Sequence, residues 1–121
     1  MNSQYIEQYP EAIESLKRSL RILSAVDSEL AAAAISMKLV DVLDSLVQKN
    51  FKQSLDDLWS CSFVIQRILY ESFSEKLDKK SDKAIIAKDS AENKDYRTSA
   101  LQYVAANLEI TNDTGFNVLF I

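Results

Sequence analysis

The residues able to carry chemistry in this sequence are carboxylates, lysines, tyrosines and one thiol, because the 121 residues include no histidine. Without histidine the chain lacks the commonest general base, the nucleophile triads built on it, and the usual nitrogen ligand of zinc and di-iron sites. A lone cysteine, Cys61, gives neither an intrachain disulfide nor a thiolate zinc site. We therefore expect a protein that is not an enzyme and that binds no cofactor and no metal.

Two acidic pairs are close enough in sequence to share a site. Asp41 and Asp44 are about one helical turn apart, and Asp56 and Asp57 are adjacent to one another. Such carboxylates can transfer protons or bind a hard cation. An acidic residue at the edge of an apolar stripe is usually solvated, however, so the pairs favour a charged surface over a catalytic or metal site.

The elements that position these residues are predicted to be helices. The chain contains one glycine and one proline, whereas sandwiches, barrels and phosphate-binding α/β folds need many of these residues in their turns. We therefore expect an all-α fold, a bundle of four to five helices with a short extended apolar tail, in a single domain 1–121.

Apolar spacing sets the expected helix boundaries. A stripe runs through Ile6, Tyr9, Ile13, Leu16, Leu20 and Leu23 at steps of three and four. It changes phase near Val26, which favours two helices in residues 1–49 over one long helix with a shifted seam. The predicted helices are 7–24, 27–49, 54–77 and 95–110, with a charged connector at 78–94 that holds about two helical turns and a C-terminal strap at 113–121. Ser54 with Asp57 is the expected cap of the third helix, and Asp95 that of the fourth.

The closing stretch DTGFNVLFI, residues 113–121, is apolar after Gly115, the single glycine, with Asn117 as the only polar interruption. Three interpretations remain open for it. The tail packs back on its own bundle, it exchanges with a second copy of the chain, or it binds a groove of a partner through its side chains and terminal carboxylate.

The net charge of the chain indicates which kinds of partner it is expected to bind. The net charge of −4 argues against nucleic acid and anionic membranes. No apolar stretch is long and uninterrupted enough to span a membrane, and the N-terminus does not resemble a signal peptide, so we expect a cytoplasmic protein.

Small acidic helical domains without catalytic residues are typical of inhibitors, immunity proteins and antitoxins, which neutralise another macromolecule by electrostatic complementarity. The sequence thus predicts a protein–protein interaction module of this kind. The alternative is a structural or adaptor subunit that forms a homodimer or part of a larger assembly. The candidate partner-binding residues are Glu7, Glu11, Glu14, Asp41, Asp44, Phe116, Val118, Phe120 and Ile121.

Overall fold

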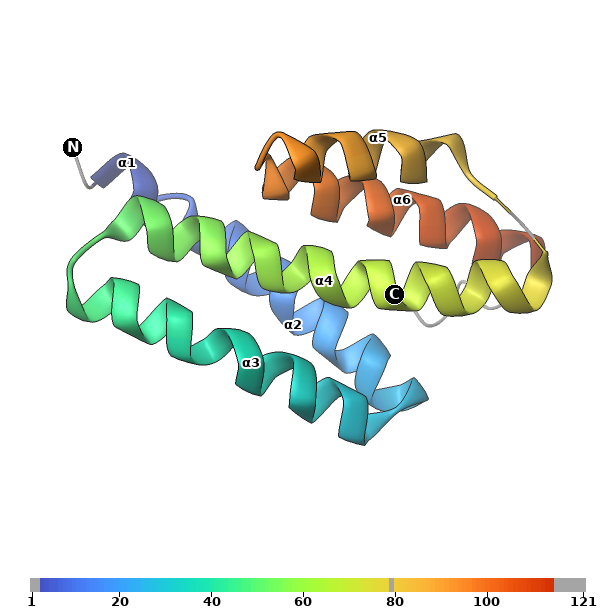
Figure 1. Cartoon of the computed structure of the whole chain (residues 1–121), viewed down its shortest axis with the longest axis horizontal. Helices are drawn as coiled ribbons and strands as arrows, with labels where there is room; N and C mark the ends of the chain where they lie inside the picture. The colour runs from blue at the N-terminus through green and yellow to red at the C-terminus, as the bar shows by residue number, and fades with distance from the viewer. Residues whose placement is uncertain (1–2, 79, 115–121) are drawn as a thin grey trace. The chain divides into compact units, whose positions relative to one another are not determined.

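The computed structural model describes residues 3–78 and 80–114, and it is all-α, as predicted (Figure 1). Its described part contains six helices, one more than the upper expectation, because one turn of helix precedes the first long element. Their bounds are α1 (Ser3–Ile6), α2 (Tyr9–Val26), α3 (Ser28–Val47), α4 (Phe51–Leu77), α5 (Asp82–Glu92) and α6 (Tyr96–Thr114).

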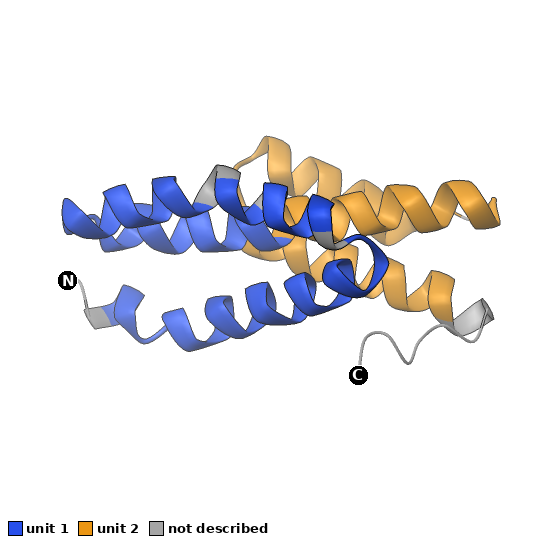
Figure 2. Ribbon diagram, turned by 90° about the horizontal axis from the view of Figure 1, so that it is seen from below, with its two compact units in different colours: residues 1–62 blue, residues 63–121 orange. Residues whose placement is uncertain are grey.

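The chain divides into two compact units, residues 1–62 and 63–121, which Figure 2 colours separately. Unit 1 holds α1, α2, α3 and the first part of α4, and unit 2 holds the rest of α4 with α5 and α6. The division thus falls inside α4, between Ser62 and Phe63, and not in a loop.

In unit 1, α2 and α3 form a helical hairpin joined by a single residue, Asp27 (Figure 1). Asp27 has extended backbone angles, and its N–H donates to the carbonyl of Leu23 at 2.7 Å. Its side-chain Oδ1 accepts from the N–H of Leu30 at 3.0 Å, so one residue ends α2 and caps α3. The phase change near Val26 therefore marks two separate helices.

Three helix ends in the described residues place a residue other than glycine at positive φ: Lys49 at 58°, Asp78 at 50° and Lys94 at 61°. After α5, the N–H of Lys94 donates to Ala91 and that of Asp95 to Ser90, the paired hydrogen bonds of a Schellman motif. Lys49 ends α3 in the same way. The next residue, Asn50, caps α4 by accepting from the N–H of Gln53 at 3.1 Å.

This cap corrects the prediction that Ser54 and Asp57 begin the third helix. Ser54 lies one turn inside α4 with its side chain buried. Asp57 accepts hydrogen bonds from Ser45 at 3.1 Å and from Gln53 at 3.0 Å. Asp57 thus joins α3 to α4 through its side chain and does not cap the helix.

The apolar stripe predicted for residues 6–23 is confirmed at Leu23, which is buried, but Ile6 and Ile13 are exposed. The other buried residues of α2, Ala12, Ser19 and Ile22, each lie one position before a residue of the stripe. Two of them are small, and Ser19 donates to the carbonyl of Ser15 at 2.9 Å.

Unit 2 is built on α5 and α6, which lie side by side (Figure 1). The segment expected to be mainly a connector, 78–94, contains the eleven-residue helix α5, whose N-cap is Ser81. Asp95 caps α6 as predicted, through its Oδ1 and the N–H of Thr98 at 3.2 Å. Helix α6 continues to Thr114, past the predicted end at 110, so the first residues of the expected strap are helical. Gly115, the strongest stop signal, comes only after that point, and the rest of the tail lies outside the described residues.

Candidate functional sites

The C-terminal half of α3 presents large apolar side chains to solvent. Five of them recur at i, i+1, i+4, i+7 and i+8, the spacing of one helical face. We call this set the α3 outer face: Leu39 (45% exposed), Val40 (60%), Leu43 (52%), Leu46 (37%) and Val47 (82%). Contiguous apolar patches of this kind are uncommon on soluble chains and usually mark interaction sites.

A second side of α3, next to the outer face, packs within unit 1. Ala31 and Val42 are buried, and Ile35 and Ser45 are half-buried. Helix α3 is therefore apolar on two sides, whereas a helix at the surface of a single domain needs only one. The second apolar side is what makes the outer face a candidate docking surface.

Asp41 and Asp44 are both exposed on α3. At 100° per residue, Asp44 lies about 40° beyond Val40, at the edge of the outer face, and Asp41 lies about 60° further round the helix. The predicted acidic docking residues of the N-terminal part are also exposed: Glu7 just before α2, and Glu11 and Glu14 on α2 itself. The five carboxylates thus come from two regions of unit 1, and only Asp41 and Asp44 share the helix of the outer face. The predicted tail residues Phe116, Val118, Phe120 and Ile121 lie outside the described part of the chain.

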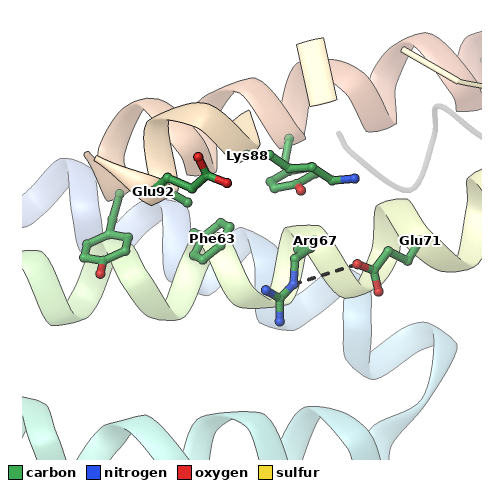
Figure 3. Close-up of a pocket in the computed structure, with 8 residues that line it drawn as sticks. Phe63, Arg67, Glu71, Lys88 and Glu92 are labelled. Carbon is green, nitrogen blue, oxygen red and sulfur yellow. Dashed lines mark ion pairs between the residues drawn. The ribbon is translucent and has the colours of Figure 1, made fainter. Parts of the chain in front are cut away.

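A second candidate site is a cavity of about 470 Å³ in unit 2, lined by α4, α5 and α6 (Figure 3). Figure 3 shows Lys88 and Glu92 of α5 opposite Phe63, Arg67 and Glu71 of α4. Cavities of about 300–1,000 Å³ that combine aromatic walls with a few polar groups are typical of small-molecule sites.

Aromatic rings form one wall of this cavity. Phe63 stacks on Tyr96 and on Tyr103, with ring centroids 6.0 and 5.9 Å apart and interplanar angles of 28°. Tyr70 continues the row, 5.7 Å from Tyr103. The guanidinium carbon of Arg67 lies 5.4 Å from the centre of the Phe63 ring, within the range of a cation–π contact.

Two hydrogen-bond donors of this cavity are buried without an acceptor among the described residues: the Tyr103 hydroxyl and the Arg67 Nε–H. The nearest carboxylate to Arg67 Nε is Glu71 Oε1 at 4.0 Å, which is too far for a hydrogen bond. Burial raises the pKa of the Tyr103 hydroxyl, with a smaller opposing effect from the Arg67 charge, so the group is a neutral O–H donor at physiological pH. Leaving a buried donor unpaired costs about 1–3 kcal/mol.

The cavity was not predicted from the sequence. Its residues are spread from Phe63 to Tyr103 over three helices, so no local spacing connects them. A weak signal was present in Tyr96 and Tyr103, which are seven residues apart and therefore fall on one face of a helix.

Three other residues with reactive or polar side chains are buried or already hydrogen-bonded. Cys61 and Trp59 are buried in α4, and Asp57 is held by Ser45 and Gln53. Within residues 3–78 and 80–114, no three histidine, cysteine, aspartate or glutamate side chains are grouped to hold a metal ion. Over the same residues, no helix combines the length and the apolar character that a membrane crossing requires.

Comparison with known proteins gives no family to which these sites can be referred. No family model matches the chain, and neither curated proteins nor solved structures gave a match. The chemistry of the two sites is therefore the basis on which a function is assigned.

Proposed function

We propose that this chain is a non-enzymatic protein-binding module that covers a basic surface with an apolar centre on another protein, as small acidic inhibitors, immunity proteins and antitoxins do. The observation that carries the proposal is the α3 outer face. The exposed fractions of its five residues add up to that of nearly three fully exposed residues. At about 1.5–3 kcal/mol for each fully buried side chain, covering them gives about 4–8 kcal/mol before the entropy of association is subtracted.

Charge selects the partner. Asp44 flanks the outer face, Asp41 lies further round α3 beyond Asp44, and unit 1 carries nine acidic against six basic side chains. A partner with lysine or arginine beside an apolar stripe would pair with these carboxylates, which speeds association and disfavours acidic competitors. We therefore assign the outer face to a basic amphipathic helix, or to a helix face of that composition in a folded protein.

The same charges disfavour a second copy of the chain on this face. In an antiparallel pair of identical helices, each edge of the apolar stripe meets its own copy. Asp44 would then lie beside Asp44 of the other chain, and like charges in contact at an interface are destabilising. A homodimer through α3 is thus the less favoured occupant, and the test below distinguishes it.

The test uses a synthetic 20-residue helical peptide with a leucine stripe flanked by lysines, and the same peptide with glutamates in place of the lysines. Binding is measured by fluorescence anisotropy at low and at physiological salt. We expect the lysine peptide to bind at least tenfold more tightly than the glutamate peptide. The double substitution Val40→Ser with Leu43→Ser should abolish binding, and Asp41→Lys with Asp44→Lys should remove the preference for lysine.

The matched control is Ile85→Ser, which removes an equally exposed apolar side chain from α5. This variant should bind the lysine peptide as the unmodified chain does. Equal binding of both peptides, no binding of either, or a chain that is dimeric by light scattering until Leu43 is replaced would each refute the proposal.

A further inference from the structure

We infer that the cavity of unit 2 is a binding site for a compact planar aromatic monocarboxylate. This site is separate from the proposed function, because its residues lie on α4, α5 and α6 of unit 2 whereas the outer face lies on α3 of unit 1. Failure of either proposal therefore leaves the other standing.

The two unpaired donors specify the anionic part of the ligand. Tyr103 is completely buried and Arg67 Nε is inaccessible, yet neither donates a hydrogen bond to any described residue. Both residues line the cavity and both lie against the Phe63 ring, with Tyr103 at 5.9 Å between ring centroids and the Arg67 guanidinium carbon at 5.4 Å from the ring centre. A carboxylate oxygen is the acceptor that satisfies both, because each of its oxygens accepts two hydrogen bonds and the guanidinium supplies the opposite charge.

The aromatic wall specifies the rest of the ligand. Phe63, Tyr96 and Tyr103 already stack as a row, and Tyr96 is the half-exposed member at its end. A planar conjugated ring extends this row in the offset arrangement that aromatic groups prefer, whereas a saturated ring of the same size loses the quadrupole contribution.

The other charged residues of the cavity limit the ligand to one negative charge. Lys88 is a second cation without an ion pair in the described structure, and it supports the carboxylate from α5. Glu71 and Glu92 are anions on the same lining, one on each side in Figure 3. A second carboxylate on the ligand would meet these side chains, so a dianion should be rejected.

The site is tested by isothermal titration calorimetry of the full chain with four probes. These are 2-naphthoate, its neutral isostere 2-naphthamide, the dianion 2,6-naphthalenedicarboxylate and the non-aromatic cyclohexanecarboxylate. We expect 2-naphthoate to bind at micromolar to low millimolar concentration and each of the others at least tenfold more weakly. Equal affinity for the acid and the amide, or no binding of 2-naphthoate at millimolar concentration, would overturn the inference.

Substitutions then separate binding from folding. Tyr103→Phe removes a hydroxyl that has no partner in the unliganded protein, so it should leave thermal stability unchanged or slightly raised while weakening 2-naphthoate about fivefold or more. Arg67→Gln should weaken 2-naphthoate at least tenfold and leave 2-naphthamide unaffected. Lys76→Gln, which removes an exposed lysine of α4 outside the cavity lining, is the control and should change neither. Unchanged 2-naphthoate affinity in both Tyr103→Phe and Arg67→Gln would refute the site even if 2-naphthoate binds elsewhere on the chain.

Discussion

Replacing Asn107 with leucine tests the buried polar contact that joins α6 to α4. The Asn107 Nδ2 donates to the side-chain oxygen of Gln66 at 2.8 Å and to its main-chain oxygen at 3.1 Å, and both residues are fully buried. Loss of the two hydrogen bonds costs about 0.5–1.5 kcal/mol each. Against this, Asn107 Oδ1 is buried without a partner among the described residues, and removing it relieves about 1 kcal/mol.

The expected net loss for Asn107→Leu is therefore about 1 kcal/mol, and at most about 2 kcal/mol, which lowers the urea midpoint by roughly 0.5–1 M. Circular dichroism at 222 nm during urea titration measures it. The double variant Asn107→Leu with Gln66→Met removes the donor and its side-chain acceptor together, so its loss of stability should be smaller than the sum of the two single losses. The corresponding coupling energy is about 1 kcal/mol or more.

The control is Asn93→Leu, the same substitution at an exposed residue whose amide donates to the carbonyl of Asp89 at 3.0 Å. It should change stability by less than about 0.5 kcal/mol. Two results would show that the buried contact does not stabilise unit 2. One is a loss of stability in Asn107→Leu as small as that of the control. The other is a loss in the double variant larger than the sum of the losses in Asn107→Leu and Gln66→Met.

Three further changes in unit 2 have expected outcomes. Lys94→Gly should raise the stability by about 1 kcal/mol in thermal unfolding, because glycine removes the side-chain clash at φ 61°, and Lys94→Ala, which keeps Cβ, should not. Asp95→Ala should lower the stability by about 1 kcal/mol because the cap of α6 is lost, whereas Asp95→Asn should keep most of that stability. Equal stability of the two variants would argue against the cap. Hydrogen bonds from Lys83 and Ser81 lower the pKa of Glu109, so its stabilising effect is present above about pH 4.5 and is lost as the pH falls through the lower folded pKa. Urea midpoints between pH 3 and 6 should therefore fall more steeply for the unmodified chain than for Glu109→Gln, and parallel curves would contradict this role of Glu109.

The fold class was predictable because composition alone decides it. A chain with one glycine and one proline lacks the residues that the many tight turns of a β fold require, whereas helices need only a few short connections. Helix ends were less predictable for the same reason. Lys49 and Lys94 have a positive φ, which is usual for glycine at a helix end. Lysine is not typical of this position, so the sequence did not indicate that these two residues end helices.

The buried faces were predictable only where large side chains fill them. Helix α5 buries Ala84 and Ala87 and exposes Ile85 and Ile86, which is the reverse of what hydrophobicity alone suggests. Alanine is chosen there because a short helix packs closely on α6, where Ser99 donates to the carbonyl of Ala87 at 2.7 Å. Helices that approach closely need small residues between them. A search for large hydrophobic residues therefore does not detect this kind of buried face.

The candidate sites were predicted unevenly. Asp41 and Asp44 were singled out from the sequence, but the neighbouring apolar residues Val40 and Leu43 have the i, i+3 spacing that is typical of a helix face packed in a core. Only the exposed fractions separate the packed side of α3 from the outer face. For Arg67 and Tyr103, the sequence carries no information on which pairs of distant residues share a cavity.

The boundary between the two units falls inside α4, so a cut of the chain at this point would divide a helix. Helix α4 is 27 residues long, and in an α-helix each N–H donates to the carbonyl four residues earlier. The N–H groups of residues 63–66 therefore have their acceptors on residues 59–62 of the same helix.

A fragment that begins at residue 63 would start with four N–H groups that have lost their helical acceptors. Hydrogen exchange at residues 63–66 should therefore be faster in such a fragment than in the full chain.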